Sequence, residues 1–230
     1  MRHNRTRRPF HHTWASGRDT LALRAVIFDY GMVLTGPPAP DAHDALVRLT
    51  GLPLDRFESH YWAHRHAYDD GSLTGLGFWQ QFNRDAGLAL TAAQLDELNA
   101  HDARMWTTQN PTMVAWQARL KQHGLRTAVL SNMGDTVFES VSRAFPWLAN
   151  FDLLIWSYQV RLAKPDPAIY RLAIQRLALP AAEILFLDDK AENIQAALSV
   201  GLQALQFSTV DNLRTQLVEA GYNTDLPLPA

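Results

Sequence analysis

Cysteine is absent from this chain of 230 residues. Its absence excludes disulfides, a thiolate nucleophile and cysteine-ligated zinc or iron–sulfur sites, and it fits a reducing compartment such as the cytoplasm. Long apolar runs are missing too: none approaches the roughly 18 residues that span a bilayer, so we expect no membrane partner. Neither sign of charge is in clear excess: the chain has 21 Lys and Arg against 23 Asp and Glu, for a net charge of −2. We therefore expect no nucleic-acid partner.

The start of the chain departs from this balance. The first 24 residues hold six arginines, three histidines and one acid, Asp19. They contain no apolar core segment, so we expect no secretory signal here. Arg-rich, acid-poor starts also occur in transit peptides and in nucleic-acid-binding arms. We interpret residues 1–23 as a basic, flexible extension.

From Arg24 onward, short apolar runs alternate with amphipathic segments. The runs predict strands at 25–28, 126–130, 153–155, 184–187 and 204–207. The amphipathic segments predict helices at 112–123, 135–144, 167–177, 191–200 and 212–219. Strands separated by helices of this length are typical of βαβ units. The runs around Val129, Ile155 and Leu185 lack polar alternation, which favours strands covered on both faces. The pattern predicts an α/β fold with a parallel sheet.

One segment, residues 37–110, has no strand pattern, and we call it the helical insert. It opens after the break Gly36-Pro-Pro-Ala-Pro40 and closes at Asn110-Pro111. Its predicted helices lie at 41–50, 54–67, 76–86 and 92–103. Thr91 with Gln94 three residues later predicts a capping box at the start of the last one. We predict a core made of residues 24–36 and 111–222, interrupted by this insert.

Polar residues follow four of the apolar or turn segments. They are Asp29, then Ser131 with Asn132, then Lys164, then Asp188 and Asp189 with Asn193. Each has an ordinary structural interpretation, as a turn residue, a loop residue or a helix-terminal charge. In this order at strand ends they favour a phosphoryl-transfer site. Asp29 can attack, Lys164 can neutralise charge, and Ser131 and Asn132 can donate hydrogen bonds. Asp189 and Asn193 can hold a hard cation.

This order resembles the haloacid dehalogenase superfamily, across about residues 24–210. The resemblance implies a Rossmann-like core, a helical cap inserted after the first motif, and Asp29 as nucleophile. It implies Mg²⁺ held by Asp29, by the backbone carbonyl of Gly31 and by an acid of the Asp188-Asp189 pair, and we favour Asp189. The stretch from Phe186 to Asn193 is similar to that of sugar-1-phosphate phosphatases and of the phosphatase domain of soluble epoxide hydrolases.

Gly31 is the main departure from that family pattern. Most phosphatases of the superfamily carry a second aspartate there, as general acid and base, whereas here we expect glycine to let the backbone turn away. Three explanations stay open: a substrate with a good leaving group such as an anomeric sugar phosphate or acyl phosphate, a proton from a cap residue, or a different reaction. Haloacid dehalogenases also lack that acid, but they need no metal. Adjacent carboxylates repel unless a cation neutralises them, so the Asp188-Asp189 pair favours Mg²⁺.

The insert holds a polar cluster between His64 and Gly71. His64 or His66 can titrate near neutrality and replace the missing acid. Tyr68 offers an aromatic face to a substrate. The alternative is a solvated helix end closed by glycine. Tyr30 either points into the mouth of the site or packs against the next loop.

The sequence thus predicts a Mg²⁺-dependent phosphatase of a small phosphorylated metabolite, such as a sugar phosphate, acting through an aspartyl phosphate on Asp29. Two alternatives remain: a 2-haloacid dehalogenase that uses Asp29 on carbon, and a catalytically weak binding module because of Gly31. The oligomeric state is not predicted.

Overall fold

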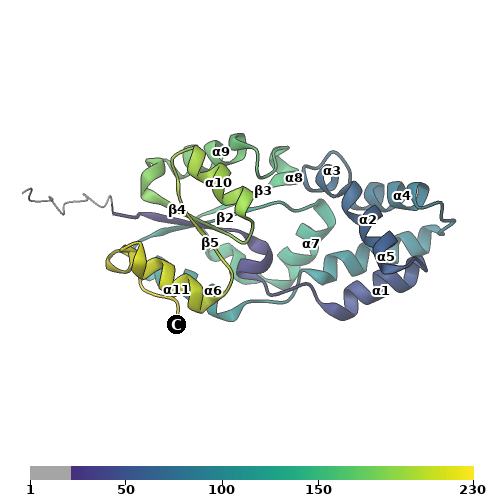
Figure 1. Cartoon of the computed structure of the whole chain (residues 1–230), viewed down its shortest axis with the longest axis horizontal. Helices are drawn as coiled ribbons and strands as arrows, with labels where there is room; N and C mark the ends of the chain where they lie inside the picture. Colours follow the sequence, from purple (N-terminus) through teal and green to yellow (C-terminus); the bar gives the residue numbers. More distant parts are fainter. Residues whose placement is uncertain (1–21) are drawn as a thin grey trace, which may run out of the picture.

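The computed structural model describes residues 22–230, and within them five parallel strands form one sheet (Figure 1). Their order across the sheet is β3-β2-β1-β4-β5. The bounds are β1 Ala25–Phe28, β2 Arg126–Ser131, β3 Leu153–Trp156, β4 Ile184–Asp188 and β5 Gln203–Gln206. Phe28 of β1 lies beside Val129 of β2 and Leu187 of β4. The predicted strands are therefore confirmed to within about one residue at each end.

Helices cover both faces of the sheet, as the uninterrupted apolar runs predicted. Alternate residues of β1 point to opposite sides: Val26 and Phe28 join one apolar cluster, and Ala25 and Ile27 join the other. The first cluster is covered by α6 (Pro111–Gln122), α7 (Asp135–Ala144) and α11 (Val210–Glu219). The second is covered by α9 (Pro167–Leu177) and α10 (Ala191–Ser199), on the other side of the sheet in Figure 1. The central strands are thus wholly buried.

Five helices between β1 and α6 make up the helical insert, at one end of the molecule in Figure 1. They are α1 Pro40–Thr50, α2 Leu54–Ala63, α3 Arg65–Asp69, α4 Gly75–Asp85 and α5 Ala92–Met105. The capping box of Thr91 and Gln94 is confirmed. The single helix expected at 54–67 is wrong, because the backbone breaks at His64, where φ is −114° and ψ is 5°.

The two ends of the insert run side by side. Thr35 and Gln109 form an antiparallel bridge, and the Gly36 N–H donates to the Thr108 carbonyl at 2.8 Å. The Asn110 N–H donates to the Leu34 carbonyl at 2.9 Å. The insert therefore enters and leaves the sheet through one paired stem.

The insert packs against the start of α7. A Cβ at Gly134 would collide with the ring of Tyr68, which stacks on Phe78 inside the insert. Only a residue without a side chain allows this approach, so Gly134 is a docking position between the insert and the helix that follows β2.

Short elements that the sequence did not predict complete the described part of the chain. An irregular helical turn covers Tyr30–Leu34, α8 covers Ser157–Val160, and 3₁₀ turns cover Pro146–Asn150, Ala181–Glu183 and Tyr222–Thr224. Of the predicted basic extension, residues 1–21 lie outside the described residues, whereas Leu23 is buried in the core. Among residues 22–230, no helix is both long enough and apolar enough to cross a membrane. A cytoplasmic location stays a prediction.

Candidate active site

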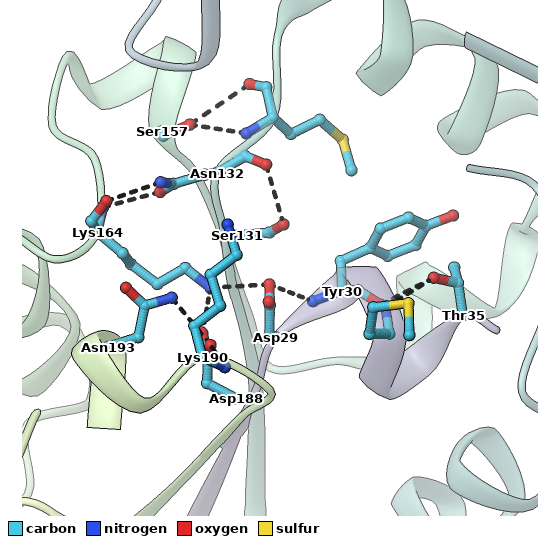
Figure 2. A network of polar contacts seen from close by, with 12 residues as sticks. Asp29, Tyr30, Thr35, Ser131, Asn132, Ser157, Lys164, Asp188, Lys190 and Asn193 are labelled. Carbon is cyan, nitrogen blue, oxygen red and sulfur yellow. Dashed lines mark hydrogen bonds and ion pairs between the residues drawn. The ribbon is translucent and has the colours of Figure 1, made fainter. Parts of the chain in front are cut away.

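Three strands of the sheet end in polar residues at the same edge. Asp29 follows β1, Ser131 closes β2 and Asp188 closes β4. A pocket of about 110 Å³ opens at this edge. The predicted site residues that line it are Asp29, Tyr30, Gly31, Ser131, Asn132, Lys164, Asp189 and Asn193. The structure therefore brings the polar residues of four distant segments together, as Figure 2 shows for most of them.

Lys164 lies at the centre of this group. Its side chain is 2% exposed, and its Nζ lies 2.8 Å from Asp29 Oδ1 and 2.6 Å from Asp188 Oδ2 (Figure 2). Burial disfavours the charged ammonium, but the two carboxylates outweigh that effect and raise the pKa of Lys164. The lysine therefore stays charged beside Asp29, where it can neutralise an anion.

Asp29 keeps one carboxylate oxygen free. Oδ1 accepts hydrogen bonds from the Tyr30 N–H at 2.7 Å and from Lys164. Oδ2 has no hydrogen-bond donor among residues 22–230. Burial raises the pKa of Asp29 to about 7, Lys164 opposes this shift, and the Asp188 and Asp189 carboxylates add to it. Such a carboxylate can act as a nucleophile or as a metal ligand.

The two adjacent acids after β4 have different surroundings. Asp188 is fully buried and accepts from Lys164, from the Lys190 N–H at 2.9 Å and from Asn193 Nδ2 at 2.9 Å. Asp189 is half-buried and lines the pocket, and no side chain of residues 22–230 donates a hydrogen bond to its carboxylate. Burial and the neighbouring Asp188 raise the pKa of Asp189. Asp189 is thus the acid of the pair that is open to a ligand.

A divalent cation fits this arrangement. Asp29, Asp188 and Asp189 each offer a carboxylate oxygen, and these oxygens lie within 4.8 Å of one another. Mg²⁺ prefers oxygen ligands, and a cation would relieve the repulsion between the acids.

Asn132 and Ser131 differ in how far their side chains are engaged. The Asn132 amide donates to the Lys164 carbonyl at 2.8 Å and accepts from the Lys164 N–H at 2.8 Å (Figure 2). Asn132 therefore holds the backbone that carries the lysine. Among residues 22–230, the Ser131 hydroxyl has only a long contact of 3.5 Å, to the Asn132 carbonyl. Ser131 is the one of the two that is available to donate into the pocket.

The expectation that Gly31 provides the turn is wrong. Gly31 has φ −63° and ψ 138°, which any residue adopts, and the left-handed residue is Met32 with φ 60°. A Cβ at Gly31 would lie 3.6 Å from the Trp106 ring, an ordinary contact.

We therefore expect Gly31→Ala to fold and to be stabilised by about 0.4–1 kcal/mol, because alanine restricts the unfolded chain at a compatible position. Urea denaturation measures this free energy of unfolding. Gly51→Ala is the matched control, since φ there is 66° and alanine would be strained. A Gly31→Ala variant less stable than Gly51→Ala would contradict this interpretation of the backbone.

The substrate residues predicted in the insert do not reach the pocket. His64 Nε2 pairs with Asp85 Oδ2 at 2.5 Å, and the His66 side chain is 76% exposed. Tyr68 is fully buried between Phe78 and Gly134, with its ring against the Arg65 guanidinium, and it does not itself line the pocket. Tyr30 does line the pocket, but its hydroxyl donates to the Trp106 carbonyl at 2.8 Å, so it packs against a loop.

Other residues of the insert line the pocket in their place. They are Trp62, Arg65, Asp69 and Trp106. Arg65 and Asp69 are four residues apart on α3, which places them on one helix face. Trp62 belongs to α2, before the break at His64, so its place in the wall depends on the fold. The sequence prediction took the histidines of this polar cluster, and they do not line the pocket.

A model of the haloacid dehalogenase-like hydrolases matches residues 23–201. The chain belongs to this family of hydrolases. The predicted superfamily and its α/β fold are confirmed.

Relatives of this hydrolase differ in their named activities. A mouse protein named acyl-CoA dehydrogenase family member 10 is 30% identical over 94% of this chain, which spans only 20% of that protein. A phosphatase of Mycobacterium tuberculosis is 27% identical, with 80% of this chain and 87% of that protein covered. An (S)-2-haloacid dehalogenase of Burkholderia cepacia is 25% identical, with 83% and 85% covered. The family thus includes both phosphatase and dehalogenase relatives of this chain.

Solved structures share the fold of this hydrolase. A HAD family enzyme from Bacteroides thetaiotaomicron, crystallised with magnesium and inorganic phosphate, superimposes with a TM-score of 0.67. It is 17% identical, and the match covers 81% of this chain and 94% of that one. At this identity the likeness establishes the fold alone.

Proposed function

We propose that this hydrolase is a Mg²⁺-dependent phosphatase of a small phosphorylated metabolite, acting through an aspartyl phosphate on Asp29. The observation that carries the proposal is the trio of Asp29, Asp188 and Asp189, whose oxygens lie within 4.8 Å of one another beside Lys164. A dehalogenase has no use for such a cluster, because halide leaves without a metal. The phosphatase relative supports the same choice.

The polar residues at the strand ends then have separate tasks. Asp29 attacks phosphorus with its free Oδ2, and Lys164 and Ser131 stabilise the charge on the phosphoryl oxygens. Asn132 positions Lys164 through its backbone. We assign Mg²⁺ to Asp29, the Gly31 carbonyl and Asp189; when bound, it supplies positive charge for the phosphoryl group. Asp188 and Asn193 hold Lys164 and the loop that carries Asp189.

The helical insert serves as a cap in this proposal. Trp62, Arg65 and Asp69 form part of the pocket wall opposite the strand ends. The paired stem of Thr35–Gly36 and Thr108–Gln109 is a place where the insert can pivot. Closure would exclude water during the attack on phosphorus, and opening would release the alcohol.

The alternative function is a 2-haloacid dehalogenase that uses Asp29 on carbon. Gly31 favours it, because a leaving halide needs no proton and the family's usual second acid is missing. The Burkholderia cepacia relative points the same way. The buried carboxylate cluster argues against it, since unneutralised acids beside the nucleophile would be unfavourable.

Activity assays separate the two functions. A panel of phosphate monoesters is incubated with the full chain and Mg²⁺, and released phosphate is measured. We expect turnover that falls at least about 100-fold in excess EDTA, because several kcal/mol of charge stabilisation would be lost with the metal. Halide release from short 2-haloacids is the parallel assay. EDTA-insensitive turnover, or halide release without phosphate release, would show the proposal to be wrong.

A further inference from the structure

The pocket contains one carboxylate that the proposed reaction leaves without a task. Asp69 is the last residue of α3, its side chain is 15% exposed, and it lines the same pocket as Asp29. Its Oδ1 accepts from Arg65 Nε at 3.0 Å. Its Oδ2 has no hydrogen-bond partner within residues 22–230. One oxygen of the Asp69 carboxylate is therefore held by Arg65, and the other is available to a ligand in the pocket.

Asp69 is tied to the catalytic edge of the sheet. Its backbone carbonyl accepts a hydrogen bond from Ser157 Oγ. The same Ser157 Oγ accepts from the Met133 N–H at 2.8 Å, and Met133 directly follows Asn132. Two hydrogen bonds thus link Asp69 to the loop of Asn132 and Met133, whose Asn132 side chain holds the backbone of Lys164. The position of Asp69 relative to the pocket is set by the core as well as by the cap.

The charges around Asp69 suit a group that exchanges protons. Burial raises the pKa of Asp69, the Arg65 guanidinium opposes the shift, the Asp102 carboxylate adds to it, and the Lys190 charge opposes it least. The net effect is a raised pKa. A carboxyl group with a raised pKa holds its proton at a higher pH than an ordinary aspartate, and a general acid must hold a proton before it can donate it.

We propose that Asp69 is the general acid and base of the phosphatase reaction, in place of the aspartate that Gly31 does not provide. The inference rests on the proposed function. In the first step the ester P–O bond breaks as Asp29 Oδ2 bonds to phosphorus, and protonated Asp69 gives its proton to the departing oxygen. In the second step water attacks phosphorus, Asp69 takes the water's proton, and Asp29 leaves. Phosphate is released, and both residues return to their starting states.

The geometry singles out Asp69 among the acids of the pocket. The pocket is lined by three carboxylates, Asp29, Asp69 and Asp189, within the described residues. Asp29 is the nucleophile and Asp189 is assigned to the metal. His64 and His66, the sequence-based candidates for this task, lie outside the pocket.

The test is the leaving-group dependence of Asp69→Asn. The asparagine oxygen can still accept from Arg65, so the variant removes the proton and little else. With an alkyl phosphate, whose alkoxide needs a proton, we expect kcat to fall about 10²- to 10⁴-fold. With p-nitrophenyl phosphate, whose phenolate leaves unprotonated, we expect a fast release of about one equivalent of nitrophenolate per enzyme, followed by slow turnover, because water attack has lost its base.

Three further variants complete the design. Asp70→Asn is the matched control: its carboxylate caps the Ser72 N–H at 2.8 Å outside the pocket, and we expect wild-type rates. Asp69→Glu restores a carboxyl group and should remove the burst. Asp29→Asn tests the proposed function separately, since it should hydrolyse neither ester. An equal loss on both esters without a burst, or an unchanged rate on the alkyl ester, overturns the role of Asp69 alone. A wild-type chain that releases no phosphate overturns both proposals.

Discussion

Asparagine in place of Asp29 is expected to reduce phosphate release by about 10⁴-fold or more, on the scale found when the nucleophile of a covalent hydrolase is removed. The free Oδ2 of Asp29 would become an amide nitrogen, which cannot attack phosphorus. Oδ1 can remain as the acceptor for the Tyr30 N–H and Lys164. The change therefore removes the reactive atom and keeps the contacts. Phosphate release under single-turnover and multiple-turnover conditions measures the effect.

We expect the Asp29→Asn variant to fold with unchanged or higher stability. Burial of the charged carboxylate raises the pKa of Asp29 to about 7, so a neutral amide relieves an unfavourable burial. We expect a Tm equal to that of the wild type or higher. Asp166→Asn is the matched control, because Asp166 caps the Ala168 N–H at 2.8 Å at the start of α9, and asparagine caps as well. Asp29→Asn activity above about one hundredth of the Asp166→Asn activity would contradict covalent catalysis by Asp29.

The sheet was predictable because its strands carry their own signal. β1 and β4 are buried on both faces, so their sequences are uninterrupted apolar runs, and their bounds were predicted to within a residue. The polar residues that follow them meet because parallel strands end at one edge. This rule alone predicts that Asp29, Ser131 and Asp188 lie together, without any knowledge of side-chain positions.

The cap wall was not predictable by the same reasoning. The break at His64 divides one amphipathic helix into α2 and α3, and it decides which side chains face the strand ends. Arg65 is buried and pairs with Asp69 and with the buried Asp102, which lies 37 positions further along the chain. Histidine chemistry suggested His64 and His66, but helix orientation depends on tertiary packing, which the local sequence does not report.

The different surroundings of Asp188 and Asp189 also emerge only from the fold. Adjacent residues at a strand end point to opposite sides, so one acid is fully buried and the other lines the pocket. The sequence favoured Asp189 from the resemblance alone. The hydrogen bonds from Lys164, Lys190 and Asn193 supply the physical reason, because they engage both carboxylate oxygens of Asp188.

Replacing Lys164 by methionine is expected to have the largest effect on stability. Lys164 is buried and pairs with both Asp29 and Asp188. Its removal leaves two buried carboxylates without their cation, which typically costs about 3–5 kcal/mol. Urea denaturation in EDTA measures the loss, so that a metal does not substitute for the lysine. Lys121→Met is the matched control: Lys121 pairs with Asp152 at 3.0 Å but is 37% exposed, and exposed pairs contribute about 0–1 kcal/mol.

The pH dependence of that loss identifies its cause. Without Lys164, the interaction that lowers the pKa of Asp29 disappears, so the pKa of Asp29 rises above its value of about 7. When a carboxyl group has a higher pKa in the folded state than in the unfolded state, the free energy of unfolding falls as the pH rises through the folded-state pKa. The destabilisation should therefore be larger at pH 8 than at pH 6, where Asp29 can take up a proton. A packing defect alone would be independent of pH, and that result would contradict the electrostatic interpretation.

Adding Asp188→Asn to Lys164→Met should recover part of the lost free energy of unfolding, because it removes one of the two unpaired charges. A double-mutant cycle measures the coupling between the two positions.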